Sequence, residues 1–369
     1  MTLRTPAYQR VLSLDVMRGL IMILLAAEAC GLYNALAEMF PTGLGHAIVS
    51  QFFHHEWHGL LAWDLVQPGF MLMAGSSLYI STTRKFDRGV SWSENLKSVA
   101  WRSLKLFLFG AALHCVYAGH LVWELWNVLT QLSIATLIAY LIIRWTSAQQ
   151  FLFSLGLLLI TELLYRTINI PGYDEPFVIG HNFGTYFDRL IMGKDNSGGW
   201  VAFNFVPTAA HTIWGVLAGK LLVNGQTSTA QIRKMVLAGT AALLVGYLLD
   251  WTDITPIIKR ISTSSFVLVS GGYIILFMAL LRWLIDTRGY DRSAWIFVVI
   301  GMNPIFIYLF FETVGKQWFN STVNIFIGGG LELLGTSSTL IGIAVALTAL
   351  LLQWLLCYWL YQKKIFFKL

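Results

Sequence analysis

The chain has 369 residues, of which 56% are hydrophobic and only 12% charged, and it carries a net charge of +6. An ordinary soluble domain has about a quarter of its residues charged, so this composition excludes a water-soluble globular protein and predicts an integral membrane protein. Basic cytosolic loops are a common source of positive charge in such proteins. The charge therefore gives no reason to expect a nucleic-acid partner.

Apolar windows of about 20 residues, the length that crosses the hydrocarbon core of a bilayer, recur along the whole chain. No break in composition separates them, so we expect one all-α polytopic domain over residues 1–369 with about ten transmembrane helices. The windows lie near 15–36, 63–83, 104–122, 127–145, 150–167, 200–223, 233–250, 262–285, 295–314 and 338–361.

The distribution of basic residues predicts the orientation of these helices. If the N-terminus is cytosolic, most of the 25 lysines and arginines fall in inner loops, as the positive-inside rule requires. We therefore expect both termini in the cytosol and the long loops 37–62, 168–199 and 315–337 on the outer side.

Ionisable side chains inside apolar segments cost free energy and by default suggest a functional site. Asp15 and Arg18 are three residues apart, on one face of a helix, where they can neutralise each other. An anion contact at the inner mouth is the alternative for this pair. Glu162 and Arg166 are placed similarly in the fifth window, and we expect them to be structural.

The segment FFHHEWHGLLAWDLVQPGF combines three histidines with Asp64 at the start of the second window. A buried carboxylate needs a cation or a donor beside it, and an imidazole is a natural partner. On one unbroken helix His54 and Asp64 would lie about 15 Å apart. Contact therefore requires a turn between them, which Gly59 can provide.

Three interpretations of this segment remain open at this point. An imidazole oriented by aspartate could act as a general base near neutral pH. His54 and His58 could bind a metal ion, but their spacing around Glu56 is not that of a metalloprotease, and no third ligand is evident. The histidines could also be interfacial groups without a chemical role.

Several motifs resemble one known family. They are SLDVMRGLIMILL, H-x-x-W-x-G-L-x-x-x-D-L-V-x-P-x-F-x-x-x-x-G-S-S from His54 to Ser77, LAGKLL, K-x-x-S-x-S-S-F from Lys259, GMN-x-I-x-x-Y from Gly301, and LYQKKIFFKL. Together they look like the heparan-α-glucosaminide N-acetyltransferase family, over nearly the whole chain.

The resemblance implies transmembrane acetylation, in which cytosolic acetyl-CoA supplies an acetyl group to the amine of a glucosamine-type sugar or oligosaccharide on the far side, without a metal. It places the family's histidine on His54 and its aspartate on Asp64. We further expect a bacterial inner-membrane protein, for which a homodimer is compatible with the family. The sequence departs from the family pattern, with Glu28 or Ala29 for Asn, Gln131 for Arg and Phe311 for His, so that the donor, the acceptor or both can differ from the family's.

Candidate substrate contacts follow from this hypothesis. For the acetyl-CoA phosphates we consider cations on the inner face, although positive-inside placement explains each of them. For the acyl path we consider polar groups at membrane depth; the alternatives are close helix packing for the serines and, for Asn303, a hydrogen bond to a carbonyl freed by Pro304. For the acceptor we consider groups on the outer side, among which Glu312 could instead pair with Lys316. The candidates for the phosphates are Arg18, Arg102, Lys105 and Lys220; those for the acyl path are Ser76, Ser77 and Asn303; and those for the acceptor are Glu28, His58 and Glu312.

A membrane transporter of amino sugars or related solutes is the rival function. In that case the buried histidine and aspartate would carry protons. Inverted repeats or paired broken helices would favour transport, and the sequence shows no such symmetry.

Overall fold

The computed structural model describes residues 11–367, which are helical apart from their connections, with one isolated β-bridge and no named strand among them. They form two compact units. Unit 1 comprises His55–Leu60 and Gln67–Trp283; unit 2 comprises Leu12–His54, Leu61–Val66 and the chain from Leu284 onward. Both units are built from apolar helices, and the single domain over 1–369 stays a prediction.

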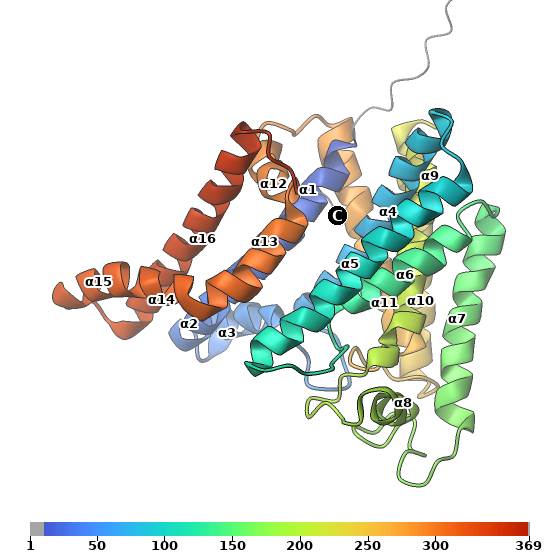
Figure 1. The fold of residues 1–369 in the computed structure, drawn as a ribbon, viewed down its shortest axis with the longest axis horizontal. Coiled ribbons are helices and arrows are strands. Elements are labelled where there is room, and N and C mark those ends of the chain that lie inside the picture. The colour runs from blue at the N-terminus through green and yellow to red at the C-terminus, as the bar shows by residue number, and fades with distance from the viewer. Residues whose placement is uncertain (1–10, 368–369) are drawn as a thin grey trace, which may run out of the picture. The chain divides into compact units, whose positions relative to one another are not determined.

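Unit 1 contains eight of the α-helices that the structure describes, and α10 and α11 lie side by side in it (Figure 1). They are α4 (Val66–Asp87, except for its first residue), α5 (Trp92–Ala118), α6 (Val128–Leu141), α7 (Ser147–Thr167), α8 (Phe183–Met192), α9 (Phe205–Val223, after the 3₁₀ turn Ala202–Asn204), α10 (Ser228–Trp251) and α11 (Ser264–Leu281).

Local sequence explains where several of these helices begin. Ser91 and Glu94 form a capping box at the start of α5, and Thr146 and Gln149 form another at the start of α7. In each box the hydroxyl accepts from the third backbone N–H while the longer side chain reaches back to the cap residue. Two of the donors that a helix start leaves unsatisfied thereby find partners.

Glycine allows α4 and α9 to approach closely inside unit 1. A Cβ on Gly75 would overlap the carbonyl oxygen of Thr212, and one on Gly215 would overlap that of Leu72. Small residues at such contacts let membrane helices pack backbone to backbone.

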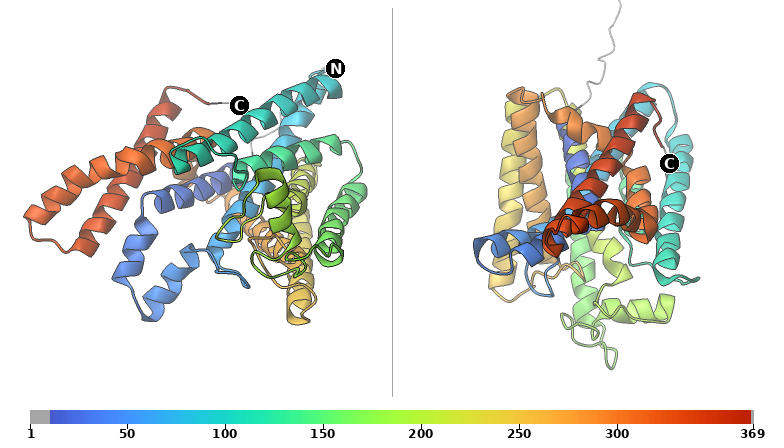
Figure 2. Two further views of the ribbon diagram at one scale, coloured as in Figure 1. Left: turned by 60° about the horizontal axis from the view of Figure 1, so that its bottom comes forward. Right: turned by 90° about the vertical axis from the view of Figure 1, so that its left-hand side faces the viewer.

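Unit 2 is built around α1 and two long C-terminal helical segments. Its α-helices are α1 (Leu12–Ala29), α2 (Leu32–Met39), α3 (Gly43–Val49), α12 (Ala294–Gly301), α13 (Pro304–Phe310), α14 (Asn320–Val323), α15 (Gly329–Leu333) and α16 (Ser338–Gln362); its 3₁₀ turns are Ser50–Phe52 and Ala62–Leu65. π-Helical segments at Phe311–Phe319 and Asn324–Gly328 join α13 to α15 in one run, on which α16 folds back (Figure 2).

Two bends interrupt the apolar segments of unit 2. α1 and α2 meet at 66° around Gly31, whose φ is 77°, and α12 meets the run Pro304–Leu333 at 73°. A left-handed glycine ends a helix without steric cost, and Pro304 stands at the first position of α13, where its missing N–H is tolerated.

The described residues contain six helices long and apolar enough to cross a membrane, or eight if each bent pair counts as one span. The chain is thus a multi-pass helical membrane protein. Two of the ten predicted windows fall short: α6 has 14 residues, about 21 Å at 1.5 Å per residue, and α4 is long enough but less apolar. The number ten stays a prediction, as does the cytosolic placement of the termini, which lie outside the described residues together with Arg4, Arg10 and Lys368.

Candidate active site

His54 and Asp64 form a hydrogen-bonded pair within unit 2. His54 follows the 3₁₀ turn Ser50–Phe52, Asp64 lies in the turn Ala62–Leu65, and His54 Nδ1 is 3.0 Å from Asp64 Oδ1. Gly59 between them has a φ of 141°, a value that only glycine adopts readily. The contact that required a turn in this segment is therefore present.

The environment of this pair fixes the proton on one imidazole nitrogen. The Asp64 side chain is 0% exposed, and its second oxygen accepts from the Leu61 backbone N–H at 2.9 Å. An ionised carboxylate only accepts hydrogen bonds, so His54 Nδ1 donates to it and Nε2 is left as the basic nitrogen. The His54 side chain is 41% exposed, so its ring is accessible from outside the protein.

Aromatic rings hold the two turns in place. Trp63 lies 6.4 Å from the His54 ring and 5.4 Å from the Tyr33 ring, and Tyr33 stacks on Phe52 at 4.6 Å. These side chains belong to one apolar cluster with Ala27 at the end of α1. His54 thus has an aromatic neighbour in this cluster as well as its hydrogen bond.

The neighbouring histidines have different surroundings, in unit 1. His58 Nε2 is 2.8 Å from Asp250 Oδ1, and the His55 ring lies where a Cβ on Gly59 would be. Among residues 11–367 no group of three or more His, Cys, Asp and Glu is arranged to hold a metal ion. Two of the three histidines, His54 and His58, therefore each pair with an aspartate.

A second polar cluster of unit 2 lies at the end of α1. Lys316 Nζ is 3.0 Å from Glu312 Oε2 and 3.6 Å from Glu28 Oε2, so one ammonium serves two carboxylates. Sequence spacing predicted the Glu312–Lys316 pair. It could not show that Glu28, almost 300 residues earlier, shares the same lysine.

Two amides complete this cluster. Asn320 Nδ2 donates to the Ala29 carbonyl at 2.8 Å, and Gln353 Nε2 lies 3.3 Å from Cys30 Sγ. The amide oxygens of both are buried without a hydrogen-bond partner. Two amides that contact the end of α1 therefore each carry a buried oxygen that could accept a hydrogen bond. Sequence reasoning missed Asn320 and Gln353, which no motif marks.

The cations considered for the acetyl-CoA phosphates have separate neighbours. Arg18 pairs with Asp15 at 3.4 Å in unit 2, as its spacing predicted. In unit 1, Lys105 lies over the Trp101 ring at 5.5 Å, and Lys220 donates to the Trp145 carbonyl at 2.8 Å. Arg102 is half-buried on α5. Their role in binding stays a prediction.

The polar groups considered for the acyl path bond mainly to backbone. Ser76 donates towards the carbonyls of Leu72 and Gly215 at 3.1 and 2.9 Å, at the close contact of α4 with α9, which is the packing alternative for this serine. Ser77, its neighbour, is half-buried on α4.

Asn303 has a different partner from the one that its neighbouring proline suggested. Its side chain donates to the Ile365 carbonyl at 3.0 Å and accepts from the Phe367 N–H at 2.9 Å. The fully buried amide thus anchors the C-terminal segment to the start of α13. No local pattern links positions 303 and 365.

The loop between α5 and α6 carries a further charged cluster in unit 1. Glu124 accepts from Lys194 at 2.6 Å and pairs with His114 at 2.9 Å. Burial alone would raise the pKa of Glu124, but Lys194 and His114 lower it below its usual value.

Asp188 on α8 lies beside this loop. It accepts from the Trp126 indole at 2.6 Å and from the Ala202 backbone at 2.9 Å. Burial raises the pKa of Asp188 to about 7, although these two hydrogen bonds oppose the shift. This carboxyl group therefore titrates near neutrality.

Comparison with known proteins gives the affiliation. The family described as heparan-α-glucosaminide N-acetyltransferase, catalytic, matches residues 10–252, well over half of the chain. The chain belongs to the heparan-α-glucosaminide N-acetyltransferase family. His54, Asp64 and Glu28 fall inside the matched region, whereas Glu312, Lys316 and Asn303 lie beyond it.

Two curated relatives of this family are similar over nearly the whole chain. The human heparan-α-glucosaminide N-acetyltransferase is 24% identical over 98% of this chain and 60% of its own length, and the mouse protein is 24% identical over 99% and 61%. The chain thus spans about three fifths of the length of the relatives it matches.

Proposed function

We propose that this membrane protein transfers an acetyl group from acetyl-CoA to the amine of a glucosamine-type sugar, with His54 as the general base. The observation that carries the proposal is the hydrogen bond between His54 Nδ1 and the fully buried Asp64. It leaves Nε2 as a base on a half-exposed ring, inside a chain whose family is named for N-acetyl transfer.

The reaction needs a base because an ammonium has no lone pair with which to attack. His54 Nε2 takes one proton from the acceptor ammonium, and the freed nitrogen forms a bond to the thioester carbonyl carbon. The C–S bond then breaks, the nitrogen loses its second proton, and the thiolate leaves as a thiol, so that one proton is released overall. Asp64 stabilises the imidazolium that forms.

A covalent route remains as an alternative order of events. In it His54 Nε2 attacks the thioester first, and the acetyl-imidazole passes the group to the amine. Both routes use the same tautomer of His54. Mass spectrometry of protein mixed with acetyl-CoA alone separates them, because only the covalent route leaves an acetyl group on His54.

The cluster at the end of α1 is the proposed acceptor subsite. Glu28 and Glu312 carry two negative charges against the single positive charge of Lys316, so the cluster attracts a cationic amine. Tyr33 lies between this cluster and the base along the chain, at the start of α2 just after the end of α1, and its ring contacts Trp63. The carboxylates would bind the amino sugar close to His54.

For the donor we propose binding from the cytosolic side. Lys and Arg bind phosphate well, and Arg18, Arg102, Lys105 and Lys220 all belong to the inner set of basic residues in the charge-derived topology. The acceptor then binds on the outer side of a bacterial inner membrane. A homodimer is compatible with this arrangement.

The test uses the full-length protein purified into lipid nanodiscs. Labelled acetyl-CoA and glucosamine are added, and N-acetylated sugar is measured for wild type, His54→Ala and His46→Ala. His46 is exposed on α3 and controls for the loss of an imidazole. We expect product from wild type and His46→Ala, and none above background from His54→Ala.

Two results would contradict the proposal. One is N-acetylation by His54→Ala at the wild-type rate. The other is the absence of product with every amino sugar tried, together with solute uptake into vesicles that carry the protein, which would favour the transporter.

A further inference from the structure

Unit 2 has an apolar groove of about 380 Å³ between three of its helices. All eight lining side chains are hydrophobic: Ile23 of α1, Trp295, Ile296 and Ile300 of α12, and four residues of α16 between Leu347 and Trp354. A water molecule takes up about 30 Å³, and a methylene group is of similar size. The groove therefore has room for on the order of ten methylene groups.

Two kinds of helix contact leave this groove open. α1 and α12 pack backbone to backbone, since a Cβ on Gly19 would overlap the Phe297 carbonyl. α12 and α16 instead meet through large rings, with Trp295 and Trp354 5.5 Å apart. The shorter isoleucine and leucine side chains beyond these rings do not fill the space.

One end of the groove is aromatic and the rest is aliphatic. The Trp354 indole donates to the Ile296 carbonyl at 2.9 Å, and Trp295 also contacts Tyr358 at 6.1 Å. Trp and Tyr gather where the hydrocarbon of a bilayer meets the headgroups. Because α16 is long and apolar enough to cross a membrane, the groove matches a lipid chain with its polar end at these rings.

Two lysines follow α16 beyond the aromatic end, where the start of α12 lies beside the end of α16 (Figure 1). Lys363 comes five residues after Tyr358, about 8 Å further along the helix axis. Lys363 and Lys364 are exposed, and no described residue forms an ion pair with either. The loop before α12 adds no net charge, because it contains Asp286, Arg288, Asp291 and Arg292.

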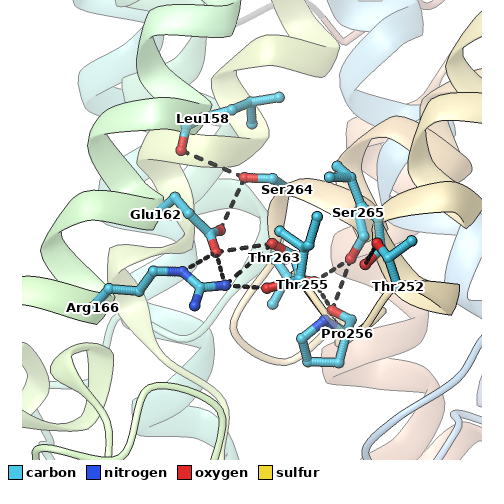
Figure 3. A network of polar contacts seen from close by, with 11 residues as sticks. Leu158, Glu162, Arg166, Thr252, Thr255, Pro256, Thr263, Ser264 and Ser265 are labelled. Atoms are coloured by element: carbon cyan, nitrogen blue, oxygen red, sulfur yellow. Dashed lines mark hydrogen bonds and ion pairs between the residues drawn. The ribbon is translucent and has the colours of Figure 1, made fainter.

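Charged groups at the end of another span, α7, are neutralised within the protein (Figure 3). Glu162 accepts from Arg166 Nε at 2.7 Å and from Thr255 Oγ1 at 2.9 Å, and Ser264 donates to its other oxygen at 3.3 Å. The expected Glu162–Arg166 pair is thus present inside unit 1. The two lysines after α16 differ, because their charge is available to an anion.

The backbone at Lys364 gives an independent reason to assign a function to its charge. The N–H groups of Lys364 and Ile365 donate back to the carbonyls of Tyr361 and Leu360, which is a Schellman motif, and the φ of Lys364 is 57°. Glycine is usual at this position, because a side chain is strained there. Lysine supplies the positive charge that glycine lacks.

We propose that the groove binds an acyl chain of an anionic phospholipid from the surrounding bilayer, with Lys363 and Lys364 beside the phosphate. A lipid chain gains little by exchanging other chains for an apolar wall. The groove therefore determines where the chain lies, and the lysines select the headgroup, each by about fivefold in binding. This site does not depend on the proposed acetyl transfer.

Native mass spectrometry of the full-length protein with defined lipids tests the selection. Dioleoyl phosphatidylglycerol is the anionic probe, and dioleoyl phosphatidylcholine has the same chains on a zwitterionic headgroup. We expect wild type to prefer the former about 25-fold, and Lys363→Gln and Lys364→Gln each to lose about fivefold of this preference. Lys97→Gln, at an exposed position of α5, should match wild type. Equal retention of the two lipids by wild type, or retention of neither, would overturn the proposal.

A phosphatidylglycerol with a photoreactive diazirine in its acyl chain locates the site. Cross-links should map to α12 and to residues 347–354. Leu351→Trp fills the groove and should remove most of them, whereas Leu352→Trp, at an exposed position outside the groove, should not. Cross-links only at other segments would overturn the site. A dimer that Leu351→Trp alone abolishes would assign the groove to a second copy of the chain instead.

Lys364→Gly separates the charge from the backbone strain. In nanodiscs of phosphatidylcholine alone, this variant should raise the thermal unfolding midpoint by about 1–3 °C, because the strain is relieved. With added phosphatidylglycerol it should lose the same preference as Lys364→Gln. A lowered midpoint would show that the lysine side chain stabilises the fold itself, and would overturn the assignment of its charge to a lipid.

Discussion

His54 and Asp64 are in hydrogen-bond contact, with 3.0 Å between Nδ1 and Oδ1, although ten positions separate them. A glycine with a φ of 141° lies in the connection, and the whole contact is built inside unit 2. The pair is therefore local in origin and does not depend on distant segments meeting.

Asp64→Asn tests the tautomer that this contact selects. An amide at position 64 can present its NH₂ group to Nδ1 and so place the proton on Nε2, which can then no longer accept one. General-base catalysis contributes about 10²–10⁴-fold, so we expect kcat for acetyl transfer to fall by roughly that factor. Wild-type kcat in this variant would show that Asp64 does not hold the proton on Nδ1.

Glu312→Gln tests the acceptor subsite. A hydrogen bond to a charged group contributes roughly 1.5–3 kcal/mol, so we expect the KM for the amino sugar to rise about 10-fold or more, with the KM for acetyl-CoA unchanged. Glu332→Gln, an exposed carboxylate on α15, is the matched control. Equal effects on both KM values would argue against a subsite for the acceptor amine.

Gly215→Ala tests the close contact of α4 and α9. The added methyl group would overlap the Leu72 carbonyl, and overpacking of this kind costs about 1–3 kcal/mol, so the thermal unfolding midpoint should fall. A methyl group added at Gly156 on α7 would have no other atom within 4 Å. Gly156→Ala should therefore leave the midpoint unchanged or raise it, because alanine favours a helix by roughly 0.5–1 kcal/mol over glycine. Similar midpoints for both variants would exclude the close approach.

Asp188 should make stability depend on pH. Burial raises its pKa to about 7 in the folded protein, against about 3.9 in an unfolded chain. The folded state holds the proton more tightly, so this group makes stability fall as the pH rises from about 4 to about 7, and the loss is complete above that range.

The measurement is the thermal unfolding midpoint between pH 5 and 8. The midpoint of wild type should fall relative to that of Asp188→Asn, whose amide does not titrate, and Asp174→Asn, at an exposed loop position, should follow wild type. The same pH slope in all three proteins would contradict the prediction.

Much of the fold could be predicted from hydropathy, because an apolar run of sufficient length has few alternatives to a helix in lipid. Each of the ten windows does coincide with a helix or a bent pair in the structure. Hydropathy does not report bends such as the one at Gly31, which depend on backbone conformation. Hydropathy also overestimated the length of α6, because this helix ends at Leu141 although the apolar residues continue beyond it.

The contacts of the candidate site can likewise be divided into those that the sequence could predict and those that it could not. His54 with Asp64 could be predicted because a short connection and a glycine limit where the two can go. Glu28 with Lys316, His58 with Asp250 and Asn303 with Ile365 could not, because tertiary packing brings together residues that no periodicity relates. Local spacing predicted partners for Glu312 and Arg18, and long-range packing added the second carboxylate.

The break at Gly31 has an electrostatic consequence. Because of this break, α1 ends at Ala29, and the helix does not continue into a further turn. A helix C-terminus carries about half a negative charge, and here the last turn of α1 carries Glu28, which shares Lys316 with Glu312. The backbone of α1 therefore adds to the negative potential of the carboxylates, so that Glu312→Gln alone, which leaves Glu28 against Lys316, would still leave a site that prefers a cation to an anion.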